Sequence, residues 1–222
     1  MKTFLLLLFS AFTSITIFAQ EDIVLDLDSI KNIKTTRYSS INEIGVNISV
    51  AVKVINKFPD NTVKEKLEAE KPSMLFRTVH GALLNPHIFV GAGVGIDFRP
   101  NNNYGIKYYN FTFPFFAELR QYILSGNFNV FFSERLGGSV YVDSYVNQNN
   151  NNGSYSGAFG EFMIGGRYVL PNRKFAMHFG VGYRLQHLQR KIDFSGSGSQ
   201  FYTNIPEITI KHYVPVSVGI TF

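Results

Sequence analysis

The chain has 222 residues, enough for one domain with its own core. It contains no cysteine, which excludes disulfides and thiolate metal sites. Its 21 basic and 16 acidic residues give a formal net charge of +5, but the basic residues are scattered rather than grouped. The charge therefore gives no reason to expect nucleic acid as a partner.

The first twenty residues have the pattern of a secretory signal peptide. Lys2 supplies a positive start, residues 4–9 are apolar, and Ala19 is a small residue at the expected cleavage point. A membrane-anchoring helix is the alternative, but serine and threonine dilute the apolar run, and a span needs about 20 apolar residues. We therefore predict a cleaved signal peptide over residues 1–20 and a periplasmic N-terminal segment over residues 21–40.

A strict alternation of apolar and polar residues runs from residue 43 to residue 54. Even positions carry only valine and isoleucine, whereas odd positions carry small, polar or charged residues, including Lys53. A strand places these two sets on opposite faces, while a helix would mix them. The segment therefore predicts a long β-strand with one apolar face.

The same period of two recurs along the chain. It is clear in residues 207–222 and in three internal segments, and weaker in three more; the internal segments are 87–98, 108–120, 175–187, 74–84, 129–142 and 158–170. Eight strands separated by turns predict an all-β protein. We expect a transmembrane, antiparallel, up-and-down β-barrel of about eight strands over residues 41–222.

The expected connections alternate between short and long. The short ones lie near residues 85–86, 124–127 and 171–173, and the long polar ones are residues 56–72, 99–107, 143–156 and 190–206. Short turns at one rim and long loops at the other are typical of outer-membrane barrels whose termini are both periplasmic. The charged stretch 63–71 is interpreted as a solvated surface that could form a helical turn.

Alternation alone does not say which face is outside, because a soluble lipocalin-like barrel would turn its apolar face inward. Two features favour a membrane barrel. Glycines such as Gly91 and Gly93 make room on the polar face, as a filled eight-stranded lumen requires. Aromatic residues also gather near both predicted rims, among them Tyr122, Phe222 and Tyr141, as in the two girdles of a membrane barrel.

Several motifs resemble the outer-membrane β-barrel domain family common in Bacteroidota, a group of porin-like and OmpA-like small barrels. The likeness covers residues 41–222 and rests on glycine-rich and aromatic strand motifs: Asn85-Pro86-His87, Gly91-x-Gly93-x-Gly95-x-Asp97, Pro114 to Arg120, Gly165 to Tyr168, Gly180 to Arg184 and Val218 to Phe222. The resemblance implies an outer-membrane location and insertion by the barrel-assembly machinery. It also implies that the C-terminal strand ending in Phe222 is the insertion signal.

Charged residues on the polar faces are expected inside the barrel. They are Glu43, Lys53, Arg77, Asp97, Glu118, Arg120, Arg135, Glu161, Arg167, Arg184, Glu207 and Lys211. Both signs occur at each depth, and buried charges are tolerable only when they are paired. We predict a stacked ion-pair network that fills the lumen; the alternative is a gated ion path along the same residues.

No motif indicates catalysis or a cofactor. The G-x-G-x-G of residues 91–95 lies within a strand, unlike a nucleotide-binding loop, and the histidines lack metal-ligand spacing. His187, Asp193 and Ser195 could form a hydrolase or acyltransferase site at one rim, but any long polar loop supplies such a set. We expect no catalytic, metal or cofactor site.

The expected function is a structural or surface-binding role in the Gram-negative envelope. The alternatives are a narrow channel for ions or small solutes and, less favoured, an enzyme of the envelope. The expected partners are outer-membrane lipid and the assembly machinery, the surface ligand is open, and we expect a monomer.

Overall fold

A computed structural model describes residues 37–222 except 60, 104–105, 124–125, 144–153, 171–174 and 196–200. Only the backbone is described for the remaining residues of 101–108, 143, 154, 191–195 and 201–204. The predicted signal peptide and most of the N-terminal segment lie outside the described residues. The described part forms nine strands: β1 (Arg37–Lys57), β2 (Thr62–Leu67), β3 (Ser73–Asn85), β4 (Ile88–Asn103), β5 (Ile106–Tyr122), β6 (Phe128–Asp143), β7 (Ser154–Val169), β8 (Ala176–Ser195) and β9 (Phe201–Thr221).

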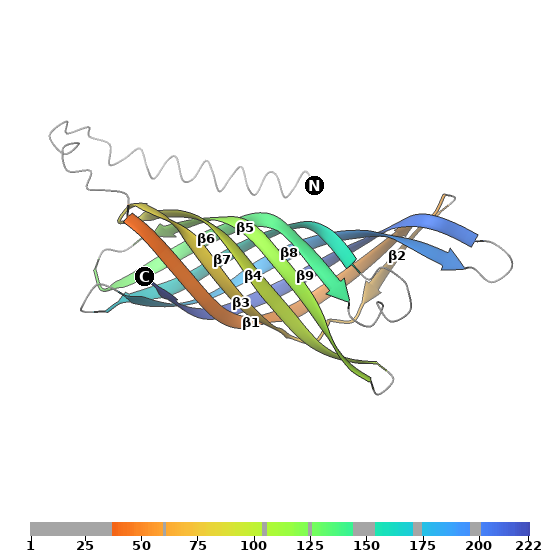
Figure 1. Cartoon of the computed structure of the whole chain (residues 1–222), viewed down its shortest axis with the longest axis horizontal. Coiled ribbons are helices and arrows are strands. Elements are labelled where there is room, and N and C mark those ends of the chain that lie inside the picture. The colour runs from red at the N-terminus through yellow and green to blue at the C-terminus, as the bar shows by residue number, and fades with distance from the viewer. Residues whose placement is uncertain are drawn as a thin grey trace. The chain divides into compact units, whose positions relative to one another are not determined.

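These strands close into one barrel (Figure 1). From β3 to β9 each strand pairs antiparallel with the next along the chain, and β1 pairs with both β3 and β9 to complete the ring. Strands β2 and β3 pair with successive parts of β1 and share one position in the wall, so the barrel is eight-stranded. The predicted all-β, up-and-down barrel is confirmed, although β1 begins at Arg37, before the expected boundary at residue 41. The described residues include no helix long and apolar enough to cross a membrane.

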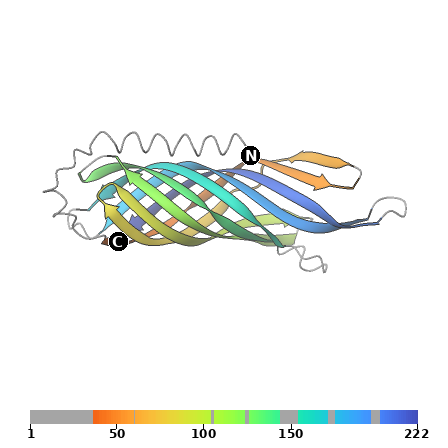
Figure 2. The ribbon, with the colours of Figure 1, turned by 90° about the horizontal axis from the view of Figure 1, so that it is seen from above.

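The two ends of the barrel differ. At the turn end lie the β3–β4, β5–β6 and β7–β8 connections together with Arg37 and Phe222 (Figure 2). The β1–β2, β4–β5, β6–β7 and β8–β9 connections lie at the loop end, and the β2–β3 connection lies part-way along the wall beside β1. Several strands extend farther toward the loop end than the alternation of apolar and polar residues predicts. Most of residues 99–107 and 190–206, expected as loops, continue the β4–β5 and β8–β9 hairpins. The stretch expected to form a helical turn is instead mainly strand β2.

A β-bulge in β1 changes which side chains enter the barrel. Ser49 pairs with Tyr213 and Ala51 with His212, so Val50 is an extra residue in β1. An extra residue reverses the alternation beyond it. Val52 therefore points inward and is buried, whereas Lys53 is exposed on the outer surface. The prediction that Lys53 belongs to the lumen is wrong for this reason.

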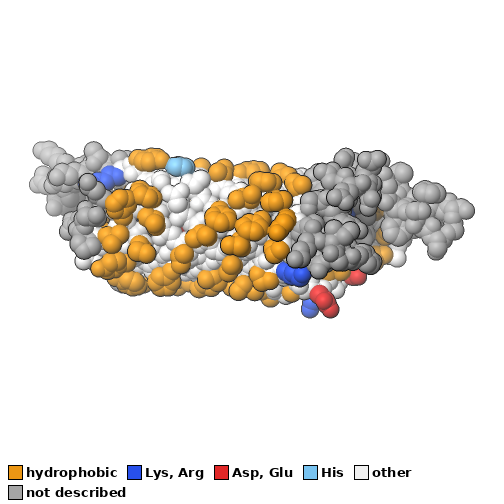
Figure 3. Space-filling model, turned by 60° about the horizontal axis from the view of Figure 1, so that its bottom comes forward, with side chains coloured by type: hydrophobic (Ala, Val, Ile, Leu, Met, Phe, Trp, Pro, Cys, Tyr) orange, Lys and Arg blue, Asp and Glu red, His pale blue; other side chains and the backbone are white. Residues whose placement is uncertain are grey.

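The barrel is apolar outside and encloses many of its charged and polar side chains. Large apolar side chains such as Ile48, Phe115 and Val218 are exposed on the outer face, and Figure 3 shows hydrophobic side chains spread along the barrel wall. Arginine, glutamate, serine and asparagine side chains are buried within it. A water-soluble barrel has the opposite arrangement, so this pattern excludes the lipocalin-like alternative. Tyr122 and Tyr141, expected in the outer girdles, are instead buried inside.

Glycines on the lumen face make space for aromatic rings. A Cβ atom built on Gly93 would lie 2.5 Å from Cζ of Phe116, a residue that is itself buried. We expect Gly93→Leu to destabilise the barrel by about 1–3 kcal/mol through overpacking. The measurement is the folded fraction after refolding into detergent. Ala92→Leu, the neighbouring change on the exposed outer face, is the control and should fold normally; equal folding of both variants would contradict a packed lumen.

Candidate functional site

Eight charged side chains meet in the lumen toward the turn end and the middle of the barrel. Four carboxylates and four guanidinium groups form this central ion network, drawn from seven strands: Glu43, Arg77, Asp97, Glu118, Arg120, Arg135, Glu161 and Arg184. All eight are almost completely buried. Their formal charges cancel, which is the condition under which buried ions are tolerable.

Arg135 lies at the centre of this network. Its guanidinium contacts Glu43 at 2.7 Å, Glu118 at 2.9 Å and Glu161 at 2.9 Å. These carboxylates come from strands β1, β5 and β7, so a single side chain of β6 connects widely separated parts of the wall. Arg120 adds contacts of 2.9 Å to Glu43 and 2.7 Å to Glu118. The ion pairs therefore connect different strands of the wall to one another through the lumen.

The remaining network members continue it toward the loop end. Arg77 contacts Glu161 at 2.6 Å, and Arg184 contacts Asp97 at 2.6 Å. On the turn side, His178 lies 3.1 Å from Glu43 through its Nε2 atom. His178 is thus a lumen hydrogen-bonding residue.

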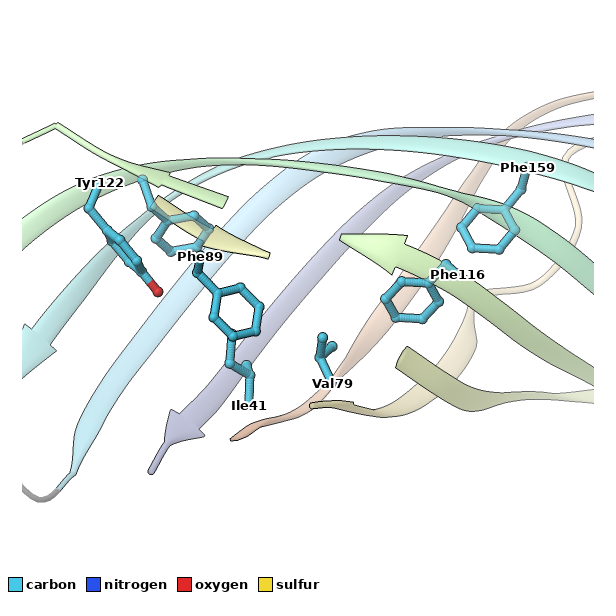
Figure 4. Close-up of a cluster of buried hydrophobic side chains, with 7 residues drawn as sticks. Ile41, Val79, Phe89, Phe116, Tyr122 and Phe159 are labelled. Atoms are coloured by element: carbon cyan, nitrogen blue, oxygen red, sulfur yellow. The ribbon is translucent and has the colours of Figure 1, made fainter. Parts of the chain in front are cut away.

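Aromatic rings fill the space that the ion pairs leave. A buried cluster contains Ile41, Val79, Phe89, Phe116, Tyr122, Phe131 and Phe159, and Figure 4 shows six of these side chains labelled between the strands. Guanidinium groups stack on the rings: Arg120 lies 4.5 Å from the centroid of Phe131, and Arg184 lies 4.4 Å from that of Phe159. Cation–π contacts of this kind are strongest where water is excluded.

Four of the predicted lumen residues lie outside the central network. Arg167 lines the turn end with its guanidinium 4.7 Å from the ring centroid of Tyr122. Glu207 pairs at 2.9 Å with Arg190, which is not among the predicted lumen residues. Lys211 belongs to a separate cluster described next, and Lys53 lies outside the barrel.

A second cluster near the loop end centres on Glu70, which precedes β3 in a segment outside the strands. Its carboxylate accepts hydrogen bonds from Lys211 at 2.8 Å and from the Tyr213 hydroxyl at 3.0 Å, and it pairs with Arg99. Arg99 also donates to the Lys71 carbonyl at 2.7 Å. Burial alone would raise the pKa of Glu70, but the charges of Lys211 and Arg99 together hold that pKa below its ordinary value. Glu70 is therefore ionised at neutral pH.

Two prolines explain why this segment can turn inward. The β3–β4 ladder ends at Met74 and Phe98, and its register places Pro72 opposite Pro100 two positions farther on. Proline has no backbone N–H to donate, so the pairing between β3 and β4 ends there, while β4 continues paired with β5. No ladder joins β2 to β4 among the described residues. The Arg99 bond to the Lys71 carbonyl bridges this interruption in the wall.

The cavities show where the lumen is filled and where it is open. Between the central ion network and the Glu70 cluster, a cavity of about 10 Å³ is lined by residues such as Asp97, Arg99 and Gln186. That volume is close to the minimum for one water molecule. Above Glu70, toward the loop end, lies a cavity of about 380 Å³, called here the loop-end vestibule. A hollow of about 750 Å³ lies on the apolar outer face near Phe179 and Phe222.

Metal-ligating side chains are dispersed in the described part of the chain. No group of three or more His, Asp or Glu side chains there is arranged to hold a metal ion. His187 lies between two inward-facing neighbours on β8 and therefore points outward, away from the vestibule. The side chains of Asp193 and Ser195 lie outside the described residues, so the rim site considered from sequence stays a prediction.

The chain matches no family model and no curated protein. The outer membrane protein OprG from Pseudomonas aeruginosa has a TM-score of 0.55 at 10% identity, with 83% of this chain and 95% of that chain covered. Neisserial surface protein A gives 0.41 at 10% identity, covering 82% and 99%. The outer membrane protease OmpT from Escherichia coli gives 0.43 at 9% identity, covering 86% and 100%. The likeness to OprG shows a shared barrel fold.

Proposed function

We propose that this protein is a closed outer-membrane barrel that acts at the cell surface by binding through its loop end, without conducting solutes through its lumen. The observation that carries the proposal is the filled interior. The paired charges and aromatic rings leave a central cavity of about 10 Å³, whereas the vestibule above Glu70 holds about 380 Å³. A solute can thus enter the loop end but meets two successive layers of ion pairs below it.

The outward-facing apolar belt supports the membrane location. Exposing such a surface to water raises the free energy, whereas contact with hydrocarbon does not. A closed barrel also leaves no unpaired strand edge in the bilayer core. In the proposed orientation the turn end, with Arg37 and Phe222, faces the periplasm, and the loop end faces the exterior. Removal of the predicted signal peptide and insertion by the barrel-assembly machinery belong to this proposal, as does the absence of enzymatic activity.

Electrical recording of the full-length protein in planar lipid bilayers tests the closed lumen. We expect no large, stable conductance, because crossing the barrel requires breaking the ion pairs around Arg135 and the Glu70 cluster. Separating buried ion pairs costs several kcal/mol. A reproducible conductance would favour the channel alternative and overturn the proposal.

Fractionation tests the location independently. The protein should remain with outer membranes and require detergent for extraction. Release into the periplasm without detergent would overturn the membrane assignment. Labelling of a residue in the β1–β2 hairpin on intact cells would support the proposed orientation.

A further inference from the structure

We propose that the loop-end vestibule is a binding site for a small neutral sugar of one or two rings. The inference rests on the proposed function, because it assigns a ligand class to the surface-exposed end of the barrel. It is carried by the vestibule's size, by unsatisfied polar atoms in its wall and by the pairing of its charges.

The vestibule has the dimensions of a ligand site. Its volume of about 380 Å³ falls in the range of roughly 300–1,000 Å³ that is typical of small-molecule pockets. The floor is formed by Glu70 and Lys211, which form an ion pair at 2.8 Å. This pair lies between the vestibule and the narrow cavity beneath. A ligand entering from the loop end would therefore stop at this floor.

Two asparagines in the wall have unsatisfied amide oxygens. Oδ1 of Asn110 and Oδ1 of Asn56 are buried and find no hydrogen-bond donor in the described structure. Both residues line the vestibule, and Asn110 also lines the narrow cavity beneath it. Asn110 is only 5% exposed. A buried acceptor without a donor costs about 1–3 kcal/mol, so these positions favour a ligand that brings O–H or N–H groups.

The charges in the wall favour a neutral ligand. Five charged residues line the vestibule, and four of them are paired: Arg190 with Glu207 at 2.9 Å, and Lys211 with Glu70. The fifth, Glu65, is exposed on β2. The two cations also lie over aromatic rings, at 4.3 Å from the Tyr155 centroid for Arg190 and 4.1 Å from the Tyr141 centroid for Lys211. A charged ligand would have to disrupt these contacts, whereas a neutral one can leave them in place.

One part of the wall is apolar. The bulge in β1 turns Val52 and Val54 inward, and Leu67 and Leu188 line the same cavity. A sugar presents both hydroxyl donors and C–H surface, which matches donor-requiring asparagines beside an aliphatic wall. A purely apolar molecule would leave the amide oxygens unsatisfied, and an ion would compete with existing pairs.

Saturation-transfer NMR on the full-length protein, purified in a sugar-free detergent, tests the proposal. The probes are glucose, N-acetylglucosamine and maltose, with glucuronate and glucosamine as charged comparators. We expect binding of at least one neutral sugar and weaker binding of both charged ones. The proposal is overturned when no neutral sugar binds or when a charged comparator binds as well as the best neutral one.

Two variants locate the site. Asn110→Leu should weaken sugar binding roughly tenfold, the effect of one lost hydrogen bond of about 1.4 kcal/mol. Because the leucine also removes an unsatisfied polar atom, the variant should melt at or above the wild-type temperature; a purely structural asparagine would give a lower melting temperature. Asn129→Leu changes another buried asparagine, one that bonds to the Gly126 carbonyl far from the vestibule, and should leave binding unchanged.

Asn56→Leu provides the same test should the Asn110 variant fail to fold, and unchanged sugar affinity in a folded variant at either site overturns the assignment. These outcomes are separable from failure of the proposed function. A conducting wild-type barrel would overturn the closed lumen, whereas a non-conducting barrel that binds none of the sugars would overturn only this inference.

Discussion

Replacing Arg135 with methionine is expected to cost at least about 3–5 kcal/mol of folding free energy, the range for removing one partner of a buried ion pair. Methionine retains much of the side-chain volume but leaves Glu43, Glu118 and Glu161 without their shared guanidinium. Glu43 and Glu118 would then share Arg120, and Glu161 would keep Arg77. Urea-induced unfolding in lipid vesicles measures the loss.

Two comparisons show whether the loss comes from uncompensated charge. Arg190→Met breaks a single ion pair near the loop end, where Arg190 is partly exposed and Glu207 is buried, so we expect a smaller cost than for Arg135→Met, which leaves three carboxylates without their shared partner. Adding Glu118→Gln to the Arg135 variant removes one unpaired carboxylate and should recover part of the lost stability. Equal costs for the Arg135 and Arg190 single variants would contradict a buried network.

A charge on the outer face should have the second large effect. Ile48 is 44% exposed in the middle part of β1, among other outward apolar residues. Arginine near the middle of a bilayer on a lipid-facing strand costs about 2–4 kcal/mol. Ile48→Arg should therefore lower the unfolding free energy by that amount in vesicles, as measured by urea titration.

Ile48→Leu is the matched control, because it keeps the position apolar and should change stability by less than about 1.5 kcal/mol. An arginine variant as stable as the leucine variant would mean that this face does not contact hydrocarbon. Such a result would count against the membrane assignment itself, whatever the state of the lumen.

The period-two pattern predicted the barrel and most of its buried charges for a simple reason. Along a regular strand, knowing the face of one residue assigns every second residue to the same face. That is why Glu118 and Arg120, or Asp97, could be placed inside from sequence alone. Their partners could not be predicted, because contacts such as Arg135 with Glu43 depend on how distant strands are staggered around the ring.

The predictions fail for residues close to interruptions in the regular strand pairing. Nothing in the unbroken alternation around Val50 indicates a bulge, so Lys53 was assigned to the wrong face. Glu70 was missed because it lies in a charged stretch that resembles solvated surface, and only the interruption at Pro72 and Pro100 lets it turn inward. These two irregularities shape the vestibule, so the candidate binding site was the least predictable part of the molecule.

The opposed prolines also divide the protein into a scaffold and an exchangeable appendage. Because the β3–β4 ladder ends before them, the β1–β2 hairpin is joined to the rest of the wall mainly through β1 and the Arg99 bridge. Insertions or grafted sequences between β1 and β2 would thus leave the stagger of the remaining strands unchanged. The barrel can diversify what it presents to its surroundings while its ionic interior stays the same.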